Sequence, residues 1–403
     1  MRNNDTEQAT RQGCPQVIVV GAGPVGLMLA GELRLRGVDV VVLERLTAPT
    51  TESRASTLHA RTMEILDQRG LLDTLGMPPR GGFGHFGGLP LDLSVPSRYA
   101  GQWKVPQARV EELLHDWGMG LGVDLRRGHE LVGLGTRPDS VEADVSGPDG
   151  NLRLRAHYLV GCDGEQSTVR RLGGFESAGD DASLELLRAD VAHIDVPNRR
   201  FERLPRGLAI ASRDPGGITR VMVHEYGRPF HRRSKAPTFS EVVRTWARVT
   251  GEDISGGTPL WVNAFGNVRR QVSQYRRDRI LLAGDAAHQQ MPVGGQALNL
   301  GIQDAVNLGW KLAAQTRGRA PSDLLDTYHA ERHAVGARVL TNIAAQATLL
   351  LAEDADPLRD IFVALLGSDD VRTGLAGMIS GVDIVYDVGP GDHPLMGRAI
   401  PHF

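Results

Sequence analysis

The chain has 403 residues, of which 41% are hydrophobic and 23% charged, and its formal net charge is −3. This composition is that of an ordinary globular protein, and the length allows two or three domains. The charge gives no electrostatic argument for a nucleic-acid partner, and the two cysteines, Cys14 and Cys162, can supply neither a disulfide framework nor a four-ligand zinc site.

The first thirteen residues are polar and lack the apolar core of a signal peptide. No stretch approaches the roughly 18 consecutive apolar residues of a transmembrane helix. We therefore expect a cytoplasmic protein without a membrane partner. The 13 histidines show no metal-binding spacing, so we expect no metal site.

The first predicted unit is a strand, a glycine-rich turn, a helix and a second strand. Val17–Val20 is a β-branched run typical of a buried parallel strand, and residues 27–36 have a helical composition. Residues 40–43 predict the second strand, which Glu44 follows. This order is typical of a dinucleotide-binding βαβ unit.

A G-x-G-x-x-G pattern lies between the first strand and the helix. Gly21 permits a tight turn, Gly23 lets the backbone approach a pyrophosphate at the helix N-terminus, and Gly26 lets helix and strand pack closely. Glu44 would accept hydrogen bonds from ribose hydroxyls and argues against a 2′-phosphate. The pattern predicts FAD or NAD here, and a purely structural turn is the alternative.

Residues 57–70 and 110–119 predict helices, whereas residues 78–96 are rich in Gly and Pro and predict loop or edge strand. Residues 158–161 predict another buried strand, which runs into Asp163 and Gly164. Apolar and polar residues then alternate in four segments, which predicts an antiparallel sheet: 187–194, 207–213, 218–226 and 260–265.

An amphipathic helix at residues 238–249 could cover one face of that sheet. The α/β character returns at residues 280–283, with long helices at 299–315 and 323–351. The predicted fold is therefore α/β, a parallel-sheet FAD-binding domain with an inserted, mainly antiparallel substrate-binding sheet and C-terminal helices. The predicted division is 14–178 for the first part of the FAD domain (with 80–100 contributing to the substrate domain), 179–270 for the substrate domain, and 271–403 for the second part and the C-terminal helices.

Three motifs, taken together and in order, indicate one protein family, although each motif alone is a weak signal. The glycine motif is followed by Asp163-Gly164 and then by Gly284-Asp285. In this order they resemble the class A flavoprotein monooxygenases of the para-hydroxybenzoate hydroxylase fold. Six further stretches resemble the branch that hydroxylates angucyclines, tetracyclines and rifamycins: 53–64, 84–90, 105–107, 217–220, 303–311 and 393–397.

The resemblance implies non-covalent FAD, NADPH or NADH as a transient reductant, and O2. A C4a-hydroperoxyflavin would then transfer oxygen to a fused-ring aromatic polyketide. The resemblance places Arg54 and Gln107 at the FAD phosphate and ribose, and Arg45 by the adenine. It places Asp163 near FAD and nicotinamide, and Asp285 at the flavin ribityl chain. Many members of the family continue into a thioredoxin-like domain, whereas this sequence stops at Phe403.

The segment that opens the helix near residue 299 has a role that follows from physics. Its backbone N–H groups and the helix dipole would face the N1–C2=O edge of the flavin, which is anionic when reduced. The expected cofactor contacts are Pro292, Gly294, Gly295, Ala297, Leu298 and Asn299. Relatives usually have Gly where this chain has Ala297, and the Ala Cβ could narrow the flavin pocket.

The strand at residues 218–226 is the predicted substrate wall. One of its faces is apolar and suits the covering helix, whereas the other mixes Met222 with the polar Arg220 and His224. A site for a polyphenolic ring needs an apolar wall with a few polar groups, so we assign these three residues to the substrate. The alternative is the solvent face of a half-buried sheet.

The predicted function is FAD-dependent hydroxylation of an aromatic polyketide. Two alternatives stay open: a Baeyer–Villiger reaction or oxidative rearrangement on the same cofactor, and an auxiliary protein that binds FAD without redox turnover. The sequence also leaves open whether the protein is a monomer or a homodimer.

Overall fold

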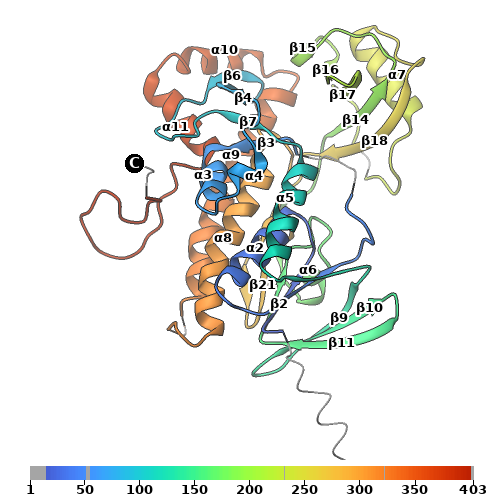
Figure 1. Cartoon of the computed structure of the whole chain (residues 1–403). Helices are drawn as coiled ribbons and strands as arrows, with labels where there is room; N and C mark the ends of the chain where they lie inside the picture. The colour runs from blue at the N-terminus through green and yellow to red at the C-terminus, as the bar shows by residue number, and fades with distance from the viewer. Residues whose placement is uncertain (1–14, 51–54, 231, 322, 401–403) are drawn as a thin grey trace, which may run out of the picture.

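The computed structural model describes residues 15–50, 55–230, 232–321 and 323–400. Figure 1 shows a central α/β body, an antiparallel sheet at the upper right, and a smaller antiparallel sheet at the bottom. A parallel sheet combined with several antiparallel sheets and C-terminal helices confirms the predicted fold class.

The central sheet has six strands in the order β20–β21–β12–β1–β2–β8, and every neighbouring pair except β20–β21 is parallel. The strands are β1 (Val17–Val20), β2 (Val40–Glu44), β8 (Asp124–Arg127), β12 (Tyr158–Gly161), β20 (Arg276–Arg277) and β21 (Ile280–Leu282). β1 and β12 are buried along their whole length, as expected in a parallel sheet covered on both faces. Because β12 lies beside β1 and β21 lies beside β12, all in parallel, the turns that follow these three strands meet at one edge of the sheet.

Helix α2 (Pro24–Leu35) follows the glycine turn and packs against α5 (Gln107–Gly120) and α8 (Gln296–Thr316). An added Cβ on Gly309 of α8 would lie 2.5 Å from Cβ of Glu32, so only glycine permits this close helix contact. The other helices are α3 (Ala60–Asp67), α4 (Leu72–Leu75), α6 (Thr168–Leu172), α7 (Phe239–Thr250), α9 (Asp326–Leu351), α10 (Asp356–Leu365), α11 (Asp369–Ser380) and the 3-10 turn η2 (Gly284–Ala286).

The antiparallel sheet at the upper right of Figure 1 has the order β15–β16–β17–β14–β18. Its strands are β14 (Glu185–Ala192), β15 (Arg199–Leu204), β16 (Gly207–Arg213), β17 (Ile218–Glu225) and β18 (Thr258–Gly266). Helix α7 covers one face, where Val242 and Trp246 form a buried cluster with Val221 and Val223. The opposite face of β17 therefore carries Arg220 and Met222.

The remaining strands form small sheets. They are β3 (Thr57–His59), β4 (Arg80–Gly81), β5 (Phe83–Phe86), β6 (Leu89–Asp92), β7 (Gln102–Lys104), β9 (Glu130–Thr136), β10 (Val141–Gly147), β11 (Gly150–Ala156), β13 (Ser177–Asp180), β19 (Arg269–Val272) and β22 (His288–Gln290). The helix predicted from residue 57 was wrong at its start. Residues 57–59 form β3 because they pair with β7, and the helix begins at Ala60.

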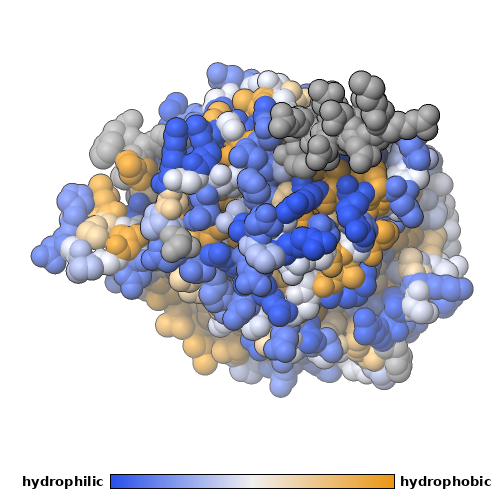
Figure 2. Space-filling view, turned by 90° about the horizontal axis from the view of Figure 1, so that it is seen from below, coloured by the Kyte–Doolittle hydropathy of each residue, from blue (hydrophilic) through white to orange (hydrophobic). Residues whose placement is uncertain are grey.

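The β9–β11 sheet lies at the bottom of the molecule in Figure 1, and Figure 2 views the protein from that side. The visible face is mostly hydrophilic, with hydrophobic residues in separate patches. The sheet carries cross-strand ion pairs such as Arg153–Asp144 at 2.6 Å. Compensated charges of this kind are typical of a solvated surface.

Helix α9 is long and apolar enough to cross a membrane by length and composition alone. Its residues Val339, Ile343 and Leu350 pack in a buried cluster with Leu208 and Met291. The apolar character of α9 is thus explained by its position in the protein core.

Candidate cofactor and substrate site

The three sequence motifs meet at the carboxyl ends of β1, β12 and β21. Gly21 has φ of 103°, and a Cβ there would lie 2.5 Å from the carbonyl oxygen of Cys162. A Cβ on Gly26 would lie 1.9 Å from the carbonyl oxygen of Gly21. Both glycines are therefore required by the turn itself.

Gly23 differs from its two neighbours in the motif, because a Cβ on it would meet no atom within 4 Å. It faces a cavity of about 590 Å³ and is the N-cap of α2, where no side chain caps the first N–H groups. An uncapped helix N-terminus that faces open space is suited to an anionic group such as a pyrophosphate.

The lining of this cavity comes from all three motifs and from α5. The residues are Gly23, Pro24, Val25, Ala55, Gln107, Cys162, Gly164, Glu165, Gln166, Arg188, Asn263, Ala264, Phe265, Gly266, Val268, Ala283, Asp285, Gln290, Pro292, Ala297 and Leu298. Gln290 has neither its amide nitrogen nor its amide oxygen hydrogen-bonded within the described part of the chain. Buried polar atoms normally have partners, so a polar ligand fits this cavity.

Glu44 lies beside this cavity and not in its lining. Its Oε2 accepts a hydrogen bond from the Ala22 amide at 2.8 Å, and its Oε1 accepts one from the Leu46 amide at 2.9 Å. A carboxylate has about four acceptor positions, so the two oxygens can still accept from a ribose. Glu44 thus also holds the glycine turn, which the sequence did not indicate.

We expect Glu44→Ala to weaken FAD binding by about 1.5–3 kcal/mol, because hydrogen bonds to a carboxylate are charge-assisted. A titration of the apoprotein with FAD measures the loss. Asp124→Ala, at an exposed carboxylate of the same sheet, is the control and should leave the affinity unchanged. Equal FAD affinity in wild type and Glu44→Ala would remove Glu44 from the site.

Asp163 does not line the cavity, although its neighbours Gly164 and Glu165 do. Its carboxylate accepts hydrogen bonds from the Ser167 hydroxyl at 2.5 Å and the Val169 amide at 3.0 Å. The carboxylate thus accepts hydrogen bonds from donors at the N-terminus of α6, as a capping side chain does. Asp163 therefore shapes the segment that carries Gly164 and Glu165 into the lining, and its assignment to the cofactor stays a prediction.

The segment from Pro292 to Asn299 is held by a histidine that the sequence did not single out. The buried His59 ring donates from Nε2 to the Gly294 carbonyl at 2.9 Å, and burial lowers the pKa of His59 to about 4. Asn299 accepts from the His59 amide at 2.9 Å and donates to the carbonyls of Gly295 and Thr57. Asn299 therefore positions this segment and does not face the cavity.

A buried ionic network supports the Gly284-Asp285 turn. The Asp304 carboxylate accepts from Arg332 Nε at 2.7 Å, from His288 Nε2 at 2.7 Å and from the Gly284 amide at 3.2 Å. The side chains of Asp304, His288 and Arg332 are 0% exposed. Burial acts to raise the pKa of Asp304, but Arg332 and His288 hold it below its usual value. Neither Asp304 nor Arg332 was predicted.

A second cavity of about 710 Å³ adjoins the first. Six residues line both: Ala55, Arg188, Phe265, Pro292, Ala297 and Leu298. Its other walls come from β5, β7, β14–β17 and from residues 291–296. The segment that begins α8 thus separates the two cavities and faces both of them.

Of the three residues assigned to the substrate, Arg220 and Met222 line this second cavity. Arg220 makes a bidentate ion pair with Asp190, with both contacts at 2.7 Å. His224 does not line the cavity. It is 4% exposed and its Nδ1 lies 2.8 Å from the Glu185 carbonyl, because β17 has passed the cavity by this residue.

The other predicted cofactor residues are distributed between the linings of the two cavities. Gln107, Asp285, Pro292, Ala297 and Leu298 line the first cavity, and Gly294 and Gly295 line the second. Arg45 is exposed and lies in neither lining. Arg54 lies outside the described residues.

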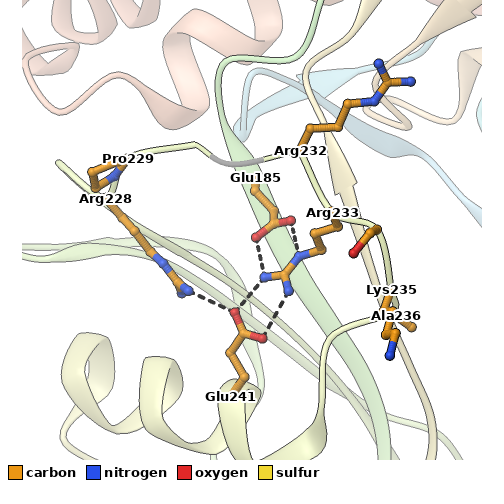
Figure 3. Close-up of a pocket in the computed structure, with 9 residues that line it drawn as sticks. Glu185, Arg228, Pro229, Arg232, Arg233, Lys235, Ala236 and Glu241 are labelled. Atoms are coloured by element: carbon orange, nitrogen blue, oxygen red, sulfur yellow. Dashed lines mark hydrogen bonds and ion pairs between the residues drawn. The ribbon is translucent and has the colours of Figure 1, made fainter.

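A separate hollow of about 410 Å³ beside α7 shares no lining residue with the two cavities. Figure 3 shows Arg233 between Glu185 and Glu241, with Arg228 also directed at Glu241. Arg233 Nη2 lies 2.6 Å from an oxygen of each acid. The acidic side chains here are matched by arginines, so this hollow is explained as a structural ion-pair cluster.

The fold and site define a FAD-dependent oxidoreductase, and comparison with known proteins agrees. The FAD binding domain family model matches residues 15–343, and the chain belongs to that family. The chain is 41% identical over 96% of its length, and 80% of the relative's, to 12-dehydrotetracycline 5-monooxygenase/anhydrotetracycline 6-monooxygenase of Streptomyces rimosus. The chain is an FAD-dependent aromatic monooxygenase.

Two other likenesses bear on its reaction. The crystal structure of CabE, an aromatic hydroxylase from angucycline biosynthesis, superposes with a TM-score of 0.94 at 50% identity, covering 97% of this chain and 80% of that one. A dialkyldecalin synthase of Streptomyces rugosporus is 40% identical over 91% of this chain and 80% of its own length.

Proposed function

We propose that this protein hydroxylates a fused-ring aromatic polyketide that lies in the 710 Å³ cavity, with FAD in the 590 Å³ cavity and NADPH or NADH as the reductant. The observation that carries the proposal is the shared wall of the two cavities at Pro292, Ala297 and Leu298. A flavin ring that lies along this wall in the first cavity would be in contact with a substrate in the second cavity. Bound FAD would supply hydride acceptance and O2 activation.

The chain's own residues would position the two molecules and shield them from water. Gly23 and the start of α2 would hold the pyrophosphate, and the N–H groups at the start of α8 would stabilise negative charge on the flavin. Phe201, Phe265 and Met222 would supply apolar walls for a flat ring system. We also propose that residues 179–270 form the substrate-binding unit.

The test is aerobic incubation of the FAD-loaded protein with NADPH and a panel of angucyclines, followed by product masses. We expect NADPH consumption that depends on the polyketide and a product heavier by one oxygen atom. A control with catalase removes effects of leaked peroxide. NADPH consumption without any oxygenated product from any member of the panel would contradict the proposal.

A second candidate function is cyclisation or rearrangement without net oxidation, which the likeness to the dialkyldecalin synthase favours. It would give a product of unchanged oxygen content, formed without NADPH. A Baeyer–Villiger reaction would instead give the same gain in mass with an ester in place of a ketone, which carbon NMR of the product distinguishes from a new phenol.

A further inference from the structure

The 710 Å³ cavity has an unbalanced lining. Five basic side chains line it, and no Asp or Glu does so within the described residues: the basic ones are Lys104, Arg188, Arg199, Arg200 and Arg220. A lining with one sign of charge concentrates the field inside a low-dielectric cavity.

Three of the five have evident partners. Arg220 pairs with Asp190 at 2.7 Å, and Arg199 pairs with Glu252 at 2.5 Å. Arg188 donates to the Asn263 side chain at 3.0 Å, and its guanidinium lies 4.3 Å from the centre of the Trp261 ring. These three arginines are therefore fixed in the cavity wall by their contacts with other protein groups.

Lys104 and Arg200 are different. The nearest polar contact of the Lys104 ammonium is the Thr57 hydroxyl at 3.5 Å, and Arg200 donates to the Gly84 carbonyl at 2.9 Å. Within the described part of the chain, neither of these contacts is to an acid, and neither cation forms an ion pair. Both residues are exposed to solvent, so water solvates their charges, and an anionic group bound in the cavity would pair with them in place of that water.

The two cations act on the same small region. Burial and then the Arg200 charge lower the pKa of Lys104, and burial, then Arg200, lower the pKa of His85 to about 3. Lys104 ends β7 beside Thr57, whose Cβ lies 3.2 Å from the position of a Cβ on Gly295. The positive region is thus next to the segment that begins α8.

We propose that Lys104 and Arg200 bind an anionic oxygen group of the substrate, so that the enzyme selects acidic polycyclic compounds that carry a carboxylate or an ionised hydroxyl. The inference rests on the proposed function, since it places the substrate in this cavity. Lysine supplies a point charge and arginine a planar pair of donors, a combination that recognises an oxyanion. These are specificity residues for the substrate and are not required to hold FAD.

The experiment uses matched ligand pairs and the FAD-loaded protein. Anthraquinone carboxylate is compared with its carboxamide, and alizarin with its dimethyl ether, by titration of the flavin absorbance and by equilibrium dialysis. We expect the anionic member of at least one pair to bind about tenfold more tightly, and its preference to fall at least about fivefold in Lys104→Met and in Arg200→Met. The pair that shows the preference tells whether the anion is a carboxylate or an ionised hydroxyl.

Lys235→Met is the matched control, because Lys235 lines the separate hollow beside α7. It should keep the full preference, and all variants should retain FAD. Equal binding of charged and neutral members by the wild type would overturn the inference, as would an unchanged preference in both cavity variants. If Lys104→Met shifts only the flavin reduction potential, the lysine serves the cofactor. Hydroxylation of a neutral polyketide with no anion preference would sink this inference and leave the proposed function intact.

Discussion

Replacing Arg332 by Met should lower the free energy of unfolding by about 3–5 kcal/mol, the largest stability effect we expect from one substitution in this chain. Arg332 is wholly buried and donates to Asp304, to the Tyr386 hydroxyl at 2.9 Å and to the Leu300 carbonyl at 3.2 Å. Its removal leaves the buried Asp304 carboxylate with His288 as its remaining side-chain partner. A buried charge that has lost its partner destabilises the folded protein more than replacement of both charges by apolar residues would.

Denaturant titration of the apoprotein, followed by circular dichroism, measures this effect. Arg338→Met on the same helix is the control, because the Arg338–Asp383 pair is partly exposed, with 41% and 27% of the two side chains accessible. An exposed pair contributes about 0–1 kcal/mol. Equal losses in the two variants would show that the Asp304 network does not depend on Arg332.

Replacing Gly23 by Ala should reduce FAD affinity roughly a hundredfold, about 3 kcal/mol, while the fold is retained. The added Cβ would contact no protein atom within 4 Å, so the protein itself tolerates it. It would occupy the space at the N-terminus of α2 that a pyrophosphate needs, and it would keep phosphate oxygens away from the backbone N–H groups.

The FAD affinity is measured by titration of the apoprotein, and the unfolding midpoint shows whether the fold is intact. Gly120→Ala, where a Cβ also meets nothing within 4 Å, is the control and should change neither quantity much. A Gly23→Ala protein that binds FAD normally would contradict the placement of the pyrophosphate. A variant that loses FAD only because it unfolds would show that Gly23 serves the turn alone.

The βαβ unit was predictable from the sequence because it depends on residues close together in the chain. A β-branched run, a glycine turn and an apolar helix predict β1, the turn and α2 without reference to the rest of the protein. The same holds for the alternating strand at residues 218–226, whose valine face lies under α7. The three motifs also predicted which turns would lie together, since parallel strands end at one edge of the sheet.

The site residues were less predictable, because a polar side chain has the same appearance in a sequence whether it faces a ligand or the backbone. Asp163 satisfies the start of α6, Asn299 ties the segment before α8 to β3, and His224 lies beyond the cavity. Their positions in the motifs indicated nearness to the site. They could not indicate the direction of each side chain.

The sequence by itself determined the fold class, the dinucleotide turn and the resemblance to flavin monooxygenases, because these follow from local patterns and their order. Only the tertiary structure decided which groups hold the segment at the start of α8 and which charges face the second cavity. His59 reaches Gly294 across 235 positions of the chain, and Arg332 reaches Asp304 between two packed helices. Contacts between residues so far apart form only when the core packs, so no local pattern in the chain records them.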